Sequence, residues 1–388
     1  MKHLRKLAIS GFLVCSLITL SSCSFLSGIA DRFGNSTTVN TTPDETTTSE
    51  SVPTTVTTTD LTTPSISTSD TSTPSSTTST IIDTPIEVTN LDYGYLDLEH
   101  YDNSDNLKLL YGDLNNALGN FYTSTIDITP ETYSIDGVDS EYYVIREIEY
   151  SKYNIEDIMA YVTLKNVLLD HPEYYFVSNE VLSSTSGSTK KIIVLADSDY
   201  ALSSNRLEYN TKIEEFKTDA IKDFTDETTV KEKVKAIHDY IISHAEYALD
   251  EFGQPSSTSF AHNLLGIVVE GKGVCESYTE LLTYILKSLE IPAITVSGKG
   301  YTSAHPTGEA HAWNYVHIDG YYYAFDVTWN DTAHTNDYYG LSYQSITKME
   351  DDHVTDGSHI ATIPSVADGI RYLYNLPELS TIDLKDRI

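Results

Sequence analysis

"HAWNYVHIDGYYYAFDVTWND", residues 311 to 331, has the pattern of two β-strands joined by a short turn. Strand-like alternation flanks Asp319-Gly320, and an Asp-Gly pair between two such runs is typical of a two-residue β-hairpin turn. A turn at that point fixes the register, so that Ile318 faces Tyr321 and each earlier residue faces a later one. The stretch therefore predicts an antiparallel hairpin with a defined pairing.

Counting by twos from the turn assigns each residue of the hairpin to one of two faces. An apolar face suited to a core carries Asn314, Val316, Ile318, Tyr321, Tyr323, Phe325 and Val327. The second face carries His311, Trp313, Tyr315, His317, Tyr322, Ala324, Asp326 and Thr328. His311 and Asp326 become diagonal neighbours, with Cβ atoms roughly 7 Å apart, within reach of a histidine–carboxylate hydrogen bond. His317 lies nearer the turn, where Asp326 is out of its reach.

Upstream of the hairpin, "GKGVCESYTELLTYILKSLEIP", residues 271 to 292, places a cysteine where a helix begins. Gly271 and Gly273 permit a tight turn. Apolar residues then recur at helical spacing until Pro292 closes the segment. At a helix N-terminus the unpaired backbone N–H groups and the helix dipole favour a thiolate, so Cys275 is a candidate nucleophile. Buried apolar filler is the alternative, although such a cysteine more naturally lies within the apolar stripe.

The other two cysteines, Cys15 and Cys23, lie at the N-terminus. A charged start and an uncharged stretch from Leu7 to Leu20 have the organisation of a secretory signal. The sequence Leu20-Ser21-Ser22-Cys23 resembles a bacterial lipobox, in which Cys23 becomes the lipidated first residue. An ordinary cleaved signal is the alternative. With residues 1–22 removed and Cys23 lipidated, Cys275 has no intramolecular disulfide partner in the polypeptide of a secreted protein.

The remainder of the chain divides into a tether and two domains. Residues 36 to 80 are mostly Ser and Thr with regularly placed prolines, which is too little apolar surface to fold, so we expect residues 23–85 to be a disordered tether. Residues 86–200 mix helical and strand-like patterns and predict a small α+β domain. Residues 201–388 open with two helical stretches and contain both motifs above, which predicts a second α+β domain.

Charge and motifs exclude several functions. The formal charge of −33 becomes −36 when Lys2, Arg5 and Lys6 leave with the signal, which argues against nucleic acid as a partner. No H-E-x-x-H, CxxC, Walker loop or G-x-S-x-G is present. His311 and His317 with Cys275 lack further ligands at zinc-site spacing, so we expect neither metal nor cofactor.

The two quoted stretches, in this order and separation, resemble the transglutaminase-like superfamily, over roughly residues 230 to 335. The resemblance implies a papain-like α+β core, in which a helix carrying Cys packs on an antiparallel sheet carrying His and Asp. It implies that Cys275 is the nucleophile, His311 the general base and acid, and Asp326 the orienting carboxylate. Trp313 and Trp329 match aromatic positions of the family's motifs and are expected to pack around the site. The preceding domain is similar to segments found ahead of this core in surface proteins of Gram-positive bacteria.

One departure from the family concerns the oxyanion. Animal transglutaminases have a tryptophan upstream of the cysteine, and no tryptophan precedes Cys275 here. The oxyanion would then use the backbone N–H of Cys275 and a hydroxyl such as that of Tyr247. We expect a lipid-anchored enzyme on the extracellular face of the membrane, acting on amide bonds of protein or cell-wall peptide by acyl transfer or hydrolysis. A papain-type cell-wall peptidase and a non-catalytic adhesion or scaffold module are the alternatives.

Overall fold

The computed structural model describes residues 90–135, 138–350, 353–361 and 375–387, together with Pro85, Val88 and the backbone of residues 17–19. The described residues of the segment 83–388 belong to one compact unit. Cys23 and the expected tether fall outside the described residues, apart from Pro85. No described helix is long and apolar enough to cross a membrane.

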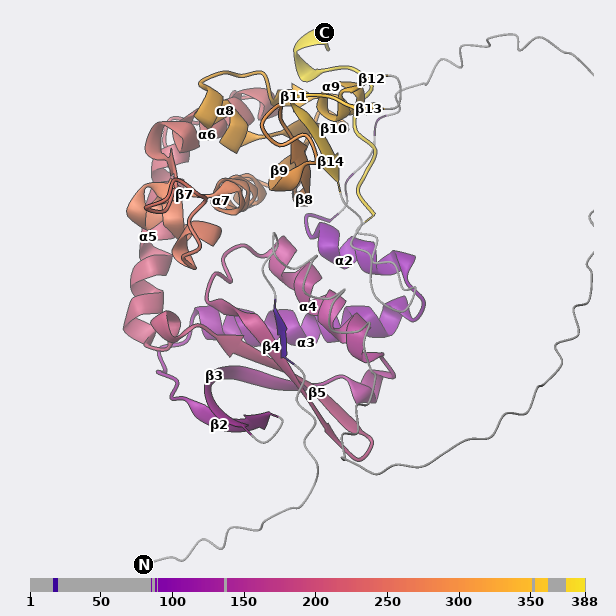
Figure 1. Cartoon of the computed structure of the whole chain (residues 1–388), viewed down its shortest axis with the longest axis vertical. Helices are drawn as coiled ribbons and strands as arrows, with labels where there is room; N and C mark the ends of the chain where they lie inside the picture. Colours follow the sequence, from indigo (N-terminus) through magenta and orange to yellow (C-terminus); the bar gives the residue numbers. More distant parts are fainter. Residues whose placement is uncertain are drawn as a thin grey trace, which may run out of the picture. The chain divides into compact units, whose positions relative to one another are not determined.

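The first half contains a sheet and three helices, shown in Figure 1. The strands are β1 (Leu17–Thr19), β2 (Glu131–Ile135), β3 (Val138–Glu149), β4 (Val177–Ser186) and β5 (Thr189–Ala196). They pair antiparallel in the order β1-β4-β5-β3-β2. The helices are α2 (Tyr93–Asp97), α3 (Ser104–Tyr122) and α4 (Asp157–Asp170). Strand β1 comes from the segment that we expect to be removed as a signal, and we give it no role.

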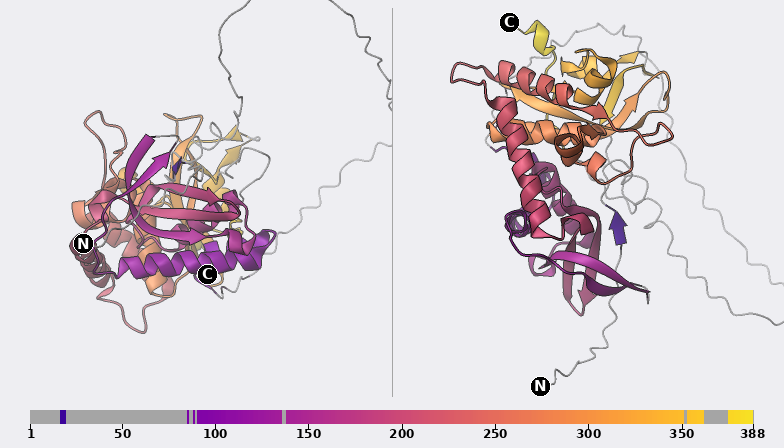
Figure 2. Two further views of the ribbon diagram at one scale, coloured as in Figure 1. Left: turned by 90° about the horizontal axis from the view of Figure 1, so that it is seen from below. Right: turned by 90° about the vertical axis from the view of Figure 1, so that its left-hand side faces the viewer.

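Apolar spacing explains how the helices of this half form and pack. Leu107, Leu110, Leu114 and Leu118 recur at three or four residues on α3 and are all buried. This helix runs along β3, as the left view of Figure 2 shows. Helix α4 ends at Asp170, because the proline two residues later disfavours helical backbone in His171.

The second half combines helices with a five-stranded antiparallel sheet. Its helices are α5 (Ser203–Ile221), α6 (Val230–His244), α7 (Cys275–Ser288), α8 (Val327–Ala333) and α9 (Tyr343–Thr347). The main sheet has the order β11-β10-β9-β8-β14, formed by β8 (Ala293–Tyr301), β9 (Glu309–Ile318), β10 (Tyr321–Phe325), β11 (Tyr339–Leu341) and β14 (Ser358–Ala361). Two minor pairs are β6 (Glu246–Tyr247) with β7 (Lys272–Gly273) and β12 (Met349–Glu350) with β13 (His353–Val354). Helix α7 packs on β8 and β9, as the sequence predicts for a papain-like core.

The hairpin β9–β10 has the predicted register. Tyr321 pairs with Ile318 and Phe325 pairs with Asn314. Asp319 and Gly320 both have positive φ, at 52° and 91°, as a type I′ turn requires. Alternate residues of the hairpin enter two separate apolar clusters, one with α7 and one containing Trp313.

The end of the second strand differs from the sequence prediction. Strand β10 ends at Phe325, and residues 327–333 form helix α8 instead of continuing the alternation. The physical reason is the side chain of Asp326, which accepts a hydrogen bond from the Trp329 backbone N–H at 3.0 Å and caps the helix. Asp326 therefore lies just beyond the sheet, at the start of a helix.

A buried arginine joins the two halves. Arg206, on α5, has no exposed surface. Its guanidinium donates to the carbonyl oxygens of Tyr200 and Ala201 at 2.6 and 3.0 Å, and to those of Ser124 and Ile126 at 3.3 and 2.7 Å. One side chain of the second half thus satisfies four backbone acceptors beside the expected domain border.

Candidate active site

Cys275 is the first residue of helix α7. A single π-helical turn, Gly266–Glu270, ends at Gly271, whose φ of +66° favours glycine. At Gly273 a Cβ atom would lie 2.3 Å from the Ser277 Cβ, so the chain can approach the helix only without a side chain there. The two glycines thus set the turn that delivers Cys275 to the helix N-terminus, where the helix dipole favours its thiolate. The side chain is 96 % buried, with 4 % of its surface exposed.

His311 connects Cys275 to Asp326. It lies near the start of β9 and is buried. Its Nε2 atom is 2.7 Å from Asp326 Oδ2, and its ring is also hydrogen-bonded to the Cys275 side chain. Because Nε2 is bound to the carboxylate, Nδ1 is the nitrogen that remains for the thiol. The three residues predicted from sequence are thus brought together by α7, β9 and the start of α8.

Electrostatics favour the imidazolium form of His311. Burial alone lowers its pKa, but the charge and hydrogen bond of Asp326, followed by those of Cys275, outweigh burial and raise the pKa to about 10. Burial likewise acts to raise the pKa of Asp326, yet His311 and a second histidine, His359, hold that pKa well below its ordinary value. The site therefore favours an imidazolium between the Cys275 sulfur and the Asp326 carboxylate at neutral pH.

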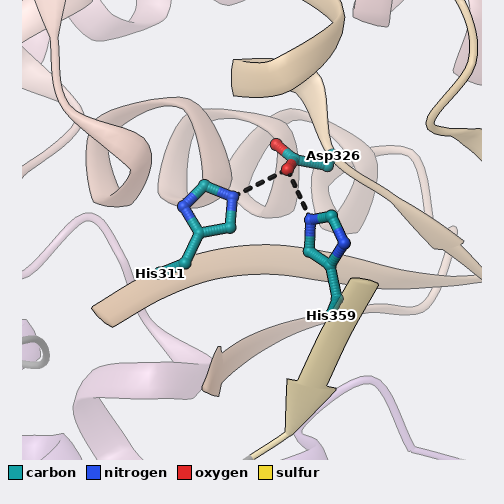
Figure 3. A group of neighbouring side chains, drawn as sticks. All are labelled: His311, Asp326 and His359. Atoms are coloured by element: carbon teal, nitrogen blue, oxygen red, sulfur yellow. Dashed lines mark hydrogen bonds and ion pairs between the residues drawn. The ribbon is translucent and has the colours of Figure 1, made fainter. Parts of the chain in front are cut away.

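His359 is the residue that sequence reasoning missed. It lies on β14, where it pairs with Gly300 of β8, and its side chain is fully buried. Its Nε2 atom is 2.8 Å from the same Asp326 oxygen that binds His311, as Figure 3 shows. No spacing in the sequence indicated this contact, because it depends on the pairing of β14 with β8.

The two tryptophans enclose the histidines, as the resemblance implies. The Trp329 ring stacks on His311 with ring centroids 5.0 Å apart and lies 4.2 Å from the His359 ring. Glycine is needed opposite it, since a Cβ at Gly300 would lie 2.7 Å from the Trp329 ring. Trp313, on β9, contacts the His359 ring edge to face at 5.1 Å. These rings shield the His311–Asp326 hydrogen bond from water.

Three other residues have positions that bear on the chemistry of the site. His317 lies next to the hairpin turn and contacts the Tyr322 ring, away from Asp326. Tyr247 lies on β6 and pairs with Gly273, two residues before Cys275, so its position permits the expected oxyanion role, which stays a prediction. His238 is buried, and its two ring nitrogens contact Asn330 and Asp239.

A metal ion is the other chemistry that this cluster could serve. Among the described residues, the group with converging ligand atoms is His311, Asp326 and His359, whose atoms lie within 4.8 Å of one another. Both histidine Nε2 atoms, however, are already hydrogen-bonded to the carboxylate. In this structure the two nitrogen atoms that could bind an ion therefore serve the carboxylate instead.

Comparison with known proteins agrees with this geometry. A family model of the transglutaminase-like superfamily matches residues 218–327, which include Cys275, His311 and Asp326. The Kyphoscoliosis peptidase of Mus musculus is 25 % identical over 144 residues, which cover 33 % of this chain and 21 % of that protein. The chain thus spans about a fifth of this curated relative's length.

Two solved structures are also similar over part of the chain. A crystal structure of a TGase has 15 % identity and a TM-score of 0.28, over 39 % of this chain and 45 % of that one. The periplasmic domain of TgpA from Pseudomonas aeruginosa has 14 % identity and a TM-score of 0.25, over 39 % of this chain and 61 % of that one. Residues 218–327 are thus the part of the chain that is similar to the transglutaminase-like superfamily.

Proposed function

We propose that this protein is a thiol enzyme that transfers or hydrolyses the acyl group of amide bonds in protein or peptide substrates. One observation carries the proposal: a single buried imidazole, that of His311, is bonded to the Cys275 thiol and, at 2.7 Å, to the Asp326 carboxylate. A nucleophile, a base and a residue that orients the base are the parts that covalent acyl chemistry requires.

The first half of the reaction forms a thioester. The Cys275 sulfur attacks the carbonyl carbon of the amide, and the carbonyl π electrons move to the oxygen. The tetrahedral intermediate collapses as the C–N bond breaks, and the imidazolium N–H of His311 protonates the departing amine. Asp326 keeps the imidazole oriented through Nε2 while Nδ1 gives up its proton. The backbone N–H of Cys275 and the Tyr247 hydroxyl are the proposed donors to the oxyanion.

The second half releases the acyl group. His311, now neutral, takes a proton from water or from a primary amine as that molecule attacks the thioester, and the thiolate leaves. Water gives hydrolysis and an amine gives transfer, and both use the same residues. The curated relative is named a peptidase, which supports hydrolysis as one outcome.

The proposed place of action is the outer face of a bacterial cell membrane, most simply that of a Gram-positive cell. A lipid on Cys23 would hold the protein there, and residues 23–85 would let the enzyme reach surface protein or cell-wall peptide. The basis is the signal-like start of the chain and its Ser/Thr-rich composition.

The test incubates the full chain with a glutamine-containing protein and a labelled primary amine, and follows the products by mass spectrometry. Incorporation of the amine means acyl transfer, whereas deamidation or backbone cleavage means hydrolysis. Purified cell-wall peptide is offered in parallel. All products should vanish in Cys275→Ala and His311→Ala.

His317→Ala is the matched control, because it removes a histidine of the same strand that lies outside the site. It should retain the products of the unaltered chain. Products that persist in Cys275→Ala would contradict the thioester mechanism. A thiol that alkylates no faster than a free cysteine would favour a non-catalytic binding module.

A further inference from the structure

A second histidine holds the carboxylate of the proposed site. We propose that His359 is a positioning residue, which locks Asp326 in the orientation that binds His311 and so sets the pH at which Cys275 becomes a thiolate. The inference rests on the proposed function and adds a fourth residue to it. The two hydrogen bonds that converge on Asp326, drawn in Figure 3, are its basis.

Three donors hold the Asp326 carboxylate, which has no exposed surface. Oδ1 accepts from the Trp329 backbone N–H at 3.0 Å, and Oδ2 accepts from His311 and from His359 at 2.7 and 2.8 Å. A buried carboxylate without donors is easily protonated, and one with a single donor can rotate. His359 supplies the second bond to Oδ2 and approaches from β14, on the far edge of the sheet from β10.

The two histidines differ in which of them carries positive charge. Both share one carboxylate oxygen, so two cations there would repel each other. His359 is fully buried, and burial lowers its pKa despite Asp326, whereas Cys275 and Asp326 together raise the pKa of His311. The proton therefore stays on His311, next to the sulfur. His359 remains a neutral N–H donor.

Few other titratable groups face this cluster. Tyr338, from the loop before β11, lies 5.5 Å from the His359 ring, and its pKa is raised by burial and by Asp326, so it stays uncharged at neutral pH. The charges of Asp337 and Asp356 also act on Tyr338, and Lys348 lies 4.9 Å from its ring. The acidic limb of the pH profile, where the alkylation rate of Cys275 rises with pH, is thus governed by Cys275, His311 and Asp326. His359 affects it by acting on Asp326.

Packing offers a rival explanation, because His359 is surrounded by Trp313, Trp329 and Tyr338. Two substitutions separate the roles. His359→Phe keeps a ring and removes the donor. His359→Gln removes the ring and keeps an N–H donor, since its Nε2 is three bonds from Cβ, as in histidine. A positioning role requires Gln to work better than Phe, and a packing role requires the reverse.

The experiment measures the rate of Cys275 alkylation by iodoacetamide from pH 4 to 9 in the full chain, with thermal unfolding as a check on folding. We expect the acidic limb of His359→Phe to move up by about one pH unit, which makes alkylation about tenfold slower on that limb. His359→Gln should stay within about twofold of the unaltered chain. A Phe variant with the unaltered pH profile, or a Gln variant shifted as far as Phe, overturns the proposal.

Three further results keep the test decisive. If the unaltered chain shows no excess reactivity over a free thiol, the proposed function fails and this inference fails with it. If the unaltered chain shows the excess reactivity and His359→Phe keeps the same pH profile, the proposed function stands and His359 has no positioning role. If Phe prevents folding, the ¹⁵N shifts of His359 in the unaltered chain decide, because a cationic ring or an Nδ1–H tautomer would contradict the assigned donor.

Discussion

Replacing Asp326 by asparagine should abolish the low-pH reactivity of Cys275. The carboxylate is the largest influence that raises the pKa of His311, against burial that lowers it. Asparagine keeps an oxygen that can accept the Trp329 backbone N–H, so the cap of α8 is retained. What disappears is the negative charge that stabilises the imidazolium.

The size of the effect follows from the pKa of His311. The rise from 6.5 to about 10, to which Asp326 contributes most and Cys275 the remainder, corresponds to roughly 5 kcal/mol in favour of the imidazolium, at about 1.4 kcal/mol per unit. Without the Asp326 charge, burial lowers the pKa of His311, and no stable cation remains beside the sulfur. The Cys275 thiol should then titrate near its ordinary value of about 8.5, so about one molecule in 3,000 is a thiolate at pH 5. The weaker nucleophilicity of a low-pKa thiolate offsets up to about 100-fold of this ratio. The unaltered chain should therefore alkylate at least about 30-fold faster at pH 5.

The assay is the pseudo-first-order rate of iodoacetamide alkylation, followed by intact mass, with circular dichroism to confirm folding. Asp331→Asn is the matched control, since it neutralises a buried carboxylate of the same helix that binds the Tyr278 hydroxyl at 2.5 Å. The control should keep the unaltered pH profile. A decrease of less than about threefold at pH 5 in Asp326→Asn would refute the argument that this carboxylate maintains the imidazolium.

Three further predictions concern stability, packing and location. The raised pKa of His311 contributes stability that is complete below pH 6.5 and lost as pH rises through about 10. The loss of unfolding free energy in His311→Gln, measured by urea unfolding, should therefore be largest near pH 6. A loss of unfolding free energy that does not vary with pH contradicts this. Gly300→Ala should displace the Trp329 ring and reduce the alkylation rate of Cys275 at pH 5. Gly112→Ala is its counterpart on helix α3: nothing lies within 4 Å of the added Cβ, so this change should stabilise the protein by about 0.5 to 1 kcal/mol. Cys23→Ala should release the protein from cell membranes into the medium, detected by immunoblot of the fractions; retention in the membrane would exclude the lipid anchor at that residue.

Local patterns account for what the sequence could predict. The positive φ values at Asp319 and Gly320 need residues that tolerate them, so the pair itself specifies the hairpin register. The helix of Cys275 follows from apolar spacing between a glycine turn and Pro292. Both elements are encoded within about twenty consecutive residues. The hairpin pattern paired His311 with Asp326, and the resemblance to the transglutaminase-like superfamily joined Cys275 to that pair.

The sequence did not predict the end of strand β10 or the contact of His359. The first depends on a competition between two local structures, and the second depends on a residue that is distant in sequence. At Asp326 a helix cap and a continuing strand compete for the same residues, and the cap prevails. His359 is 33 residues from Asp326 in sequence, and its position depends on the antiparallel pairing of β14 with β8. Nothing in the spacing around His359 distinguishes it from an ordinary strand histidine.

The four carbonyl contacts of Arg206 have a consequence for anyone who divides this chain. A recombinant fragment that begins at residue 201 would retain the arginine but lose the backbone acceptors contributed by Ser124, Ile126 and Tyr200. The guanidinium would then lose three of the four carbonyl groups that accept its hydrogen bonds, and the surface of the second half that residues 90–200 cover would be exposed to water. Residues 90–200 therefore help to bury the interior of the second half, and an expression boundary belongs ahead of residue 90.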